Sequence, residues 1–331
     1  MRPNILVIFT GGTIGSALDG AYIAPSAEKP YALLEWYKSN YNTDVDFHTQ
    51  APYTLLSENL TGTYISRLLQ CVAGGIREGY DGIIVTHGTD TLQYAASAVG
   101  YLTGASGIPV VFVSSNYVLE DERANGRDNF CCAVDFILGG EGQGTFLSYR
   151  NRDGITYLHR AARALPYLPY DDEIYSLFGQ FYGYYREGIF IRNKHYRAVP
   201  DGEWDNAQSA GAGLAACSAV FRVFPYPGMA YPSALPDCRA ILLDTYHAGT
   251  ICNLTPDIER FFDGVYRAGI PVYRVGATAG MDYESVKEME KYQIKTLPQM
   301  SPLAAYMKLW LLLDGKEELL FCSRGEDIVP K

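Results

Sequence analysis

The chain has 331 residues, of which 48% are hydrophobic and 19% are charged, so it can bury a sizeable core and is not globally disordered. Its formal net charge of −10 argues against a nucleic-acid or anionic-membrane partner, because either would require a basic surface. The seven cysteines suggest no disulfide framework, and together with the five histidines they show no metal-ligand spacing. We therefore expect reduced thiols, no metal and no cofactor.

The N-terminus, Met1–Asn4, leads directly into an apolar run without a signal segment. The apolar run Leu309–Leu313 is far too short to span a bilayer. These features predict a cytoplasmic protein.

Strands and helices alternate through the first half of the sequence. Apolar runs predict strands at 4–9, 82–86 and 109–113, each buried on both faces. Helical spacing of apolar residues predicts helices at 61–79 and 92–102, and an Asp-Gly turn predicts a hairpin over 16–23. This rhythm is typical of a parallel sheet with right-handed crossovers, whose ligands bind at the carboxyl ends of the strands.

The second half begins with a tyrosine-rich segment, 167–196, in which the pattern predicts no regular element. Alternation then resumes, with strands at 240–244 and 271–275 and helices at 256–268 and 301–313. We predict an α/β fold with a larger N-terminal domain (1–199), built on a doubly wound, mostly parallel sheet. A linker (200–215) precedes a smaller C-terminal α/β domain (216–331) with a parallel sheet.

Two motifs follow the first two predicted strands of the sheet. TGGTIG occupies 10–15 and HGTDT occupies 87–91. If the two strands are neighbours, two hydroxyl groups and a carboxylate meet at one sheet edge, and such groups can attack a carbonyl. Each motif alone has a structural explanation, since Gly-Gly makes tight turns and His87 is compatible with a buried, hydrogen-bonded histidine. Neither a dinucleotide-binding nor a Walker motif is present.

Together these motifs resemble the bacterial-type L-asparaginases, and most of all their cytoplasmic type I branch. The similarity extends to Tyr22-Ile23 in the hairpin, Ser57-Glu58-Asn59 before a helix, Ser115-Asn116 in a third loop, and Tyr226-Pro227-Gly228 in the second half. It is dense to about residue 163 and sparse beyond.

The resemblance implies hydrolysis of the side-chain amide of asparagine through a threonine ester. It makes Thr13 the nucleophile and Tyr22 the flap residue that helps to remove its proton. Thr89 and Asp90 correspond to the second catalytic triad, and Asp90 also holds the α-ammonium group of the substrate.

The same resemblance implies a set of substrate-binding residues. Ser57 and Glu58 lie where the family binds the α-carboxylate and α-amino end, and Ser115 lies in the third loop of the active face. Backbone N–H groups at glycine turns such as Gly88 would face the developing oxyanion. Active sites of this family are completed near a neighbouring subunit, so a homodimer or homotetramer is expected.

One departure from the family concerns the lysine that ends its second triad. The best match is Arg163, within His159-Arg160-Ala161-Ala162-Arg163. Arginine is permanently charged at neutral pH, so it can pair with Asp90 but cannot act as a base. If Arg163 occupies the place of the lysine, Arg163→Lys should raise kcat.

Two alternatives remain open beside asparagine hydrolysis. A non-catalytic amino-acid-binding protein would keep the binding residues without the proton relay. A glutaminase of the archaeal Glu-tRNA amidotransferase type, which Ser57-Glu58-Asn59 also resembles, would prefer glutamine and depend on a partner protein. That protein has an extra domain before its first strand, whereas here the first strand begins at Asn4.

Overall fold

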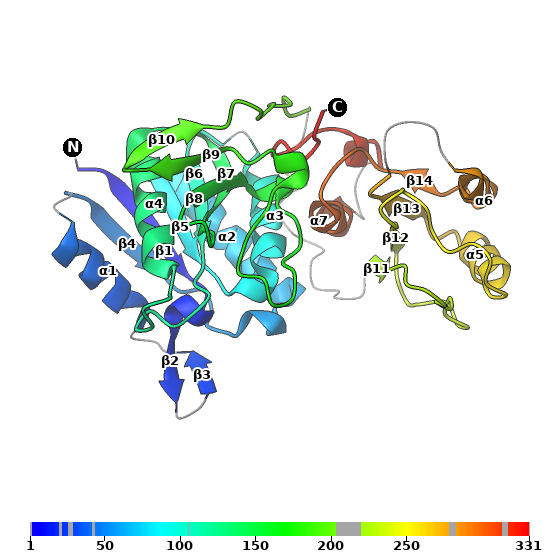
Figure 1. The fold of residues 1–331 in the computed structure, drawn as a ribbon, viewed down its shortest axis with the longest axis horizontal. Coiled ribbons are helices and arrows are strands. Elements are labelled where there is room, and N and C mark those ends of the chain that lie inside the picture. Colours follow the sequence, from blue (N-terminus) through cyan, green and yellow to red (C-terminus); the bar gives the residue numbers. More distant parts are fainter. Residues whose placement is uncertain are drawn as a thin grey trace.

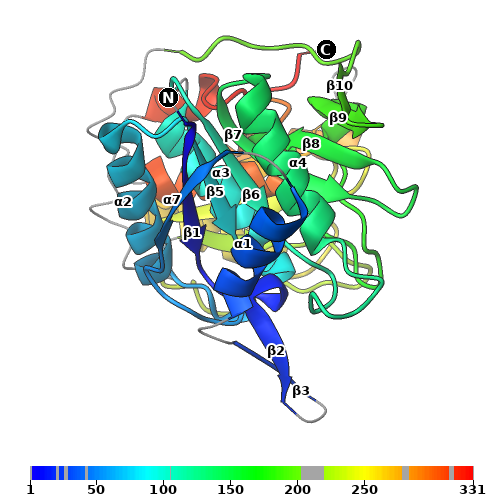
Figure 2. The same ribbon diagram turned by 90° about the vertical axis from the view of Figure 1, so that its left-hand side faces the viewer.

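Two β-sheets organise the chain (Figure 1), and a small hairpin projects from the first (Figure 2). The computed structural model describes residues 2–19, 22–25, 29–41, 44–104, 106–202, 220–277, 283–312 and 317–330. The first sheet has eight strands in the order β10-β9-β8-β7-β6-β5-β1-β4, and the second has four in the order β11-β12-β13-β14.

The first sheet is mostly parallel, as predicted. Its strands are β1 (Asn4–Phe9), β4 (Asp46–Gln50), β5 (Gly82–Thr86), β6 (Pro109–Val113), β7 (Gly144–Arg150), β8 (Thr156–Arg160), β9 (Gly183–Arg186) and β10 (Ile189–Arg192). The run β4-β1-β5-β6-β7 is parallel, whereas β8, β9 and β10 add antiparallel strands at one edge. Because β1 pairs directly with β5, the two motif-bearing strands are neighbours.

Helices cover both faces of this sheet, which confirms the predicted doubly wound architecture. Helices α2 (Gly62–Glu78) and α3 (Leu92–Thr103) lie on one face, and α1 (Lys29–Asn40) and α4 (Gly126–Gly139) lie on the other (Figure 2). The β1 side chains alternate between the two cores, with Leu6 and Ile8 in the first and Ile5 and Val7 in the second. Because β1 is buried on both faces, it requires apolar residues at successive positions rather than at alternate ones.

The absence of regular structure predicted for the tyrosine-rich segment is wrong over 183–192. Strands β9 and β10 form a tight hairpin there, joined by Glu187 (φ 53°) and Gly188 (φ 76°). A two-residue turn with both φ values positive matches the right-handed twist of the flanking strands.

The second sheet is parallel, as predicted, and consists of β11 (Val220–Val223), β12 (Ala240–Asp244), β13 (Val272–Val275) and β14 (Lys295–Thr296). Helices α5 (Ile258–Arg267) and α6 (Lys287–Lys291) cover one face, and α7 (Pro302–Leu312) covers the other.

Helix α7 also packs against the first domain. The Tyr101 hydroxyl oxygen on α3 lies 3.1 Å from the Ala304 carbonyl oxygen on α7. Helix α7 therefore lies between the two sheets (Figure 1). Most of the predicted linker falls in 203–219, outside the described residues, so the domain boundaries stay a prediction. No helix in the described ranges is long and apolar enough to cross a membrane.

Candidate active site

Three loops meet at the carboxyl ends of the central strands. They are the loop after β1, the segment leading to α2, and the loop after β5. The Gly12 N–H donates to the Leu55 carbonyl and the Leu55 N–H donates to the Thr10 carbonyl, each at 3.2 Å. The first two loops are thus joined by backbone hydrogen bonds.

Glycines allow these loops to approach unusually closely. A Cβ atom on Gly12, whose φ is 76°, would lie 2.3 Å from the Gly88 nitrogen. A Cβ atom on Gly88 would lie 2.4 Å from Ser57 Oγ. Side chains at these two positions would therefore push the loops apart. One glycine of each motif, Gly12 and Gly88, is explained by this contact, and each immediately precedes a threonine, Thr13 or Thr89.

We expect Gly88→Ala to impair both the site and the fold. The φ of Gly88 is −77°, which alanine tolerates, so the added methyl group acts mainly by displacing Ser57. Activity should fall about 10- to 100-fold, and unfolding should become easier by about 1–3 kcal/mol, as for other overpacked positions.

The matched control is Gly74→Ala in α2, where an added Cβ meets no atom within 4 Å. This change should stabilise the protein by about 0.5–1 kcal/mol and leave activity unchanged. Urea denaturation and initial-rate measurements on both variants test the pair. Equal activities in the two variants would contradict the proposed role of the Gly88 contact.

His87 is a buried structural histidine that connects the loops. Its Nδ1 lies 2.6 Å from Thr10 Oγ1 and its Nε2 lies 3.1 Å from Thr91 Oγ1, while the Thr91 hydroxyl donates to the Ser57 carbonyl at 2.9 Å. Burial lowers the pKa of His87 to about 4, so the ring is neutral at physiological pH. The structural interpretation of this residue is confirmed.

The depressed histidine pKa predicts acid sensitivity. The folded protein protonates His87 at a pKa of about 4, and His159, also buried, at about 3, whereas an unfolded histidine titrates near 6.5. Between pH 6.5 and 4 the unfolded chain binds more protons, so stability is full above pH 6.5 and falls as the pH drops through this window.

The contribution of His87 should reach roughly 3 kcal/mol at the acid end. Urea denaturation at pH 7, 6 and 5 should show a shallower decline in His87→Gln than in the wild-type protein. Parallel declines in the two proteins would contradict this assignment.

The remaining residues of the first motif lie near the hairpin. Thr13 opens a short 3₁₀ turn, Thr13–Gly15, and is half-buried. The predicted hairpin is present as β2 (Ser16–Asp19) and β3 (Tyr22–Pro25), with Asp19 paired to Tyr22. The Tyr22 side chain lies outside the described residues, so its predicted contact with Thr13 stays a prediction.

A cavity of about 450 Å³ opens beside the second motif. Its lining residues are Thr89, Asp90, Asn116, Tyr149, Tyr167, Leu168, Pro169, Tyr170, Asp171 and Asp172. Of the residues predicted for the site, Thr89 and Asp90 line this cavity. Thr13, Ser57 and Glu58 are not among its lining residues; Ser57 is buried at the contact with Gly88, and Glu58 is exposed.

The third loop contributes Asn116 rather than Ser115. The Ser115 hydroxyl is buried and donates to the Tyr117 carbonyl at 2.5 Å, so it is used within its own turn. Asn116 lines the cavity and exchanges two hydrogen bonds with Asn125, between side-chain oxygens and backbone N–H groups, at 3.1 and 3.2 Å.

Sequence reasoning missed the opposite wall of this cavity. Tyr149 is the penultimate residue of β7. Residues 167–172 belong to the tyrosine-rich segment, which returns to the carboxyl edge of the sheet. The sequence analysis predicted neither β7 nor a role for Tyr149. Nothing in the spacing of 167–172 indicated which edge the loop approaches.

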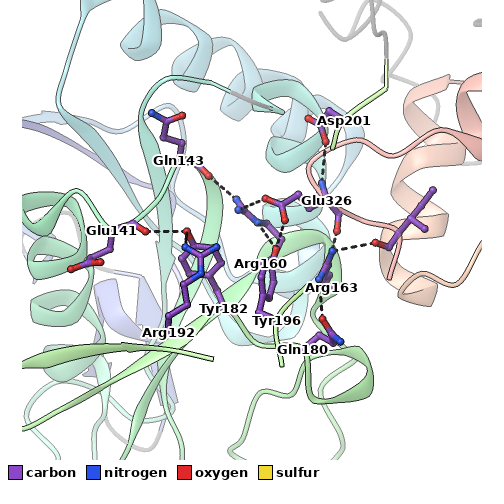
Figure 3. A network of polar contacts seen from close by, with 11 residues as sticks. Glu141, Gln143, Arg160, Arg163, Gln180, Tyr182, Arg192, Tyr196, Asp201 and Glu326 are labelled. Carbon is purple, nitrogen blue, oxygen red and sulfur yellow. Dashed lines mark hydrogen bonds and ion pairs between the residues drawn. The ribbon is translucent and has the colours of Figure 1, made fainter. Parts of the chain in front are cut away.

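Arg163 lies elsewhere, and the expected pairing with Asp90 is wrong. Its guanidinium donates from Nε to the Glu326 carbonyl at 2.6 Å, from Nη2 to the Ile328 carbonyl at 3.2 Å and from Nη1 to Gln180 Oε1 at 3.5 Å (Figure 3). The ring of Tyr196 lies 4.6 Å beneath it. The side chain is fully buried in this network.

The topology explains the difference. Strand β8 runs antiparallel to β7 and pairs Arg160 with Phe146, near the start of β7. The turn that carries Arg163 follows immediately, at the edge where the parallel strands begin, whereas Asp90 lies at the edge where they end. A motif match indicates only which residue takes a place in the sequence. It does not indicate where the side chain points, because that depends on its partners, which for Arg163 are carbonyl groups of the C-terminal segment.

We therefore expect Arg163→Lys to destabilise the protein without raising kcat. An ammonium group cannot reproduce the planar set of donors, so buried carbonyl groups lose their partners, at a cost of about 2–4 kcal/mol. Chemical denaturation and kinetics on the folded fraction measure the two effects separately. A rise in kcat at unchanged stability would restore the interpretation made from the sequence.

No group of three or more histidine, cysteine, aspartate or glutamate side chains within the described ranges could hold a metal ion. The donors at the cavity are hydroxyl groups, amides and carboxylates on separate loops.

Comparisons with known proteins match the first half of the chain to a family model and the whole chain to a known fold. Residues 4–165 match the family model described as Asparaginase, N-terminal. The thermostable L-asparaginase of Thermococcus kodakarensis shares the fold, with a TM-score of 0.76 and 20% identity, over 99% of this chain and 100% of that one. L-asparaginase I of Vibrio cholerae aligns with a TM-score of 0.80 and 20% identity, over 99% and 100% of the two chains.

Curated sequence relatives carry a different name. A glutamyl-tRNA(Gln) amidotransferase subunit from Haloquadratum walsbyi is 32% identical over 163 residues, which are 49% of this chain and 36% of that protein. The protein of the same name from Methanosarcina mazei is 34% identical over 136 residues, covering 40% and 31%. The match thus spans about a third of the length of these relatives.

Proposed function

We propose that this chain, whose residues 4–165 form an N-terminal domain of the asparaginase family, is an amidohydrolase that releases ammonia from a side-chain carboxamide, with asparagine as the reference substrate. One observation carries the proposal. Gly12 closely approaches Gly88 at the carboxyl edge of the sheet, and these two glycines immediately precede Thr13 and Thr89 in the chain, which supports a shared role for the two threonines.

In the proposed reaction the Thr13 oxygen attacks the amide carbon and forms a tetrahedral intermediate. The hydroxyl proton is transferred to the leaving nitrogen, which departs as ammonia and leaves a threonine ester. Water then attacks the ester, releases the acid and returns the proton to Thr13. Backbone N–H groups of the glycine turns would stabilise the oxyanion, and each such donor contributes on the order of 10²–10³ in rate.

Thr89 and Asp90 would act beside this nucleophile. Asp90 is exposed at the cavity, and in the described part of the chain it forms no ion pair, so its carboxylate is available to a substrate ammonium group. Because Arg163 is committed to the C-terminal segment, the proposed mechanism uses no basic residue at that position.

The decisive measurement is ammonia release from asparagine and from glutamine by the isolated protein, with boiled protein as the blank. Release from asparagine that exceeds release from glutamine is the expected result. Binding of asparagine without ammonia release, and unaffected by Thr13→Ala, would instead support a non-catalytic binding protein.

A second candidate rests on the names of the curated relatives. A glutaminase component of the amidotransferase type would prefer glutamine and would need a partner protein for full activity. Light scattering during size-exclusion chromatography helps to distinguish the two. A homodimer or homotetramer with activity of its own supports the first candidate, and an inactive monomer supports the second.

A further inference from the structure

The cavity beside Asp90 is strongly acidic. Three of its lining residues, Asp90, Asp171 and Asp172, are carboxylates, and none is lysine, arginine or histidine. Its volume of about 450 Å³ falls within the range of about 300–1,000 Å³ typical of small-molecule sites. The cavity can therefore hold a ligand larger than water.

Little of this negative charge is compensated by the protein. Asp171 pairs with Arg152 at 3.3 Å, but the Arg152 side chain is 58% exposed, so water weakens this attraction. Within the described ranges, Asp90 and Asp172 form no ion pair. Carboxylates gathered in a concave site with few counter-charges create a field that attracts cations and repels anions.

Aromatic side chains line the same cavity as these carboxylates, and two of their hydroxyl groups form no hydrogen bond with a described residue. Tyr149 is fully buried, and its hydroxyl has no hydrogen-bond partner among the described residues, although the residue lines the cavity. The Tyr167 hydroxyl also has no hydrogen-bond partner among the described residues, although Tyr167 as a whole is only partly buried. Burial raises the pKa of Tyr149, so its hydroxyl stays protonated.

A buried hydroxyl without a partner is costly unless a ligand or water satisfies it, and tyrosine rings attract ammonium and guanidinium groups. The tyrosines therefore point to a ligand independently of the carboxylates.

Resting on the proposed amidohydrolase activity, we propose that the cavity selects a carboxamide whose remaining part carries an amine or guanidinium group and no carboxylate next to it. Asparagine itself carries a carboxylate beside its ammonium group. In this cavity that carboxylate would face Asp171 and Asp172, with no cationic lining residue to receive it.

The substrate preference is tested with three related amides. They are asparagine, 3-aminopropanamide (asparagine without its carboxylate) and succinamic acid (asparagine without its amine). We expect kcat/KM for 3-aminopropanamide to exceed that for asparagine by about 10-fold or more, with succinamic acid the poorest substrate. Asp172→Asn should reduce this preference about 10-fold, whereas Glu122→Gln, an exposed carboxylate that does not line the cavity, should leave it unchanged.

A binding experiment separates this inference from the proposed reaction. Thermal denaturation is followed with 1,4-diaminobutane or with succinate at equal ionic strength. Stabilisation by the diamine alone, lost in the Asp171→Asn/Asp172→Asn double variant, supports a cation-selective cavity even if no amide is hydrolysed. Absence of stabilisation by the diamine, equal stabilisation by succinate, or an undiminished diamine effect in the double variant would overturn the inference.

Discussion

Asp327→Ala is expected to lower the free energy of unfolding by about 3–5 kcal/mol, the largest stability effect of any substitution considered. Asp327 Oδ2 pairs with Lys308 Nζ at 2.8 Å and accepts a hydrogen bond from the Tyr101 hydroxyl at 2.9 Å. The side chains of Lys308 and Asp327 are only 1% and 0% exposed. Removing the carboxylate leaves a buried ammonium ion without its counter-charge.

Two control variants test whether the loss of stability comes from the unpaired buried charge. Lys308→Met combined with Asp327→Ala removes both charges, so it should be less destabilising than Asp327→Ala alone. Asp44→Ala breaks an exposed pair with Arg2, in which the Arg2 and Asp44 side chains are 62% and 71% exposed, and should cost less than about 1 kcal/mol. If Asp327→Ala and Asp44→Ala have similar denaturation midpoints, the buried pair does not stabilise the junction between α3 and α7.

The largest expected effect on activity belongs to Thr13→Ala. If Thr13 is the nucleophile, its loss should reduce kcat by roughly 10³-fold or more while KM changes little. If Thr89 assists proton transfer beside this nucleophile, Thr89→Val, which keeps the shape of the side chain, should reduce kcat by about 10²–10⁴-fold.

Thr49→Val on the exposed face of β4 is the matched control and should retain full activity. Initial rates of ammonia release, with circular dichroism to confirm folding, measure all three variants. If Thr13→Ala retains activity and Thr89→Val does not, the nucleophile has been assigned to the wrong motif.

The central sheet and the edge that carries the site could be predicted because their signals are local. The β1 and β5 strands are continuous apolar runs, and each ends in glycine and hydroxyl residues, so adjacency alone brought Thr13 and Thr89 to one edge. The glycines had a further reason that only the structure shows, which is backbone contact between loops far apart in sequence.

The sequence could not indicate the features that depend on long-range contacts. Arg163 was assigned by its place in a motif, yet its partners Glu326 and Ile328 come from the far end of the chain. Asp171 and Asp172 belong to a loop without periodicity, and their approach to Asp90 follows from how the segment folds back after β8. Tyr149 lies in β7, a strand that the sequence analysis did not predict, and its place at the cavity follows from the position of β7 in the sheet.

The arginine network at the start of the parallel strands has a consequence for synthesis on the ribosome. Arg163 is completed by a carbonyl group 163 residues later in the chain, and Arg160 binds the carboxylate of the same Glu326 at 2.6 Å. The emerging first domain therefore carries two arginines without their final partners while the second sheet is still being translated. When the C-terminal segment leaves the ribosome, its contacts with Arg160 and Arg163 should stabilise this domain against local unfolding. Nascent chains stalled before Glu326 should therefore be cleaved by proteases around β8 more readily than the released protein.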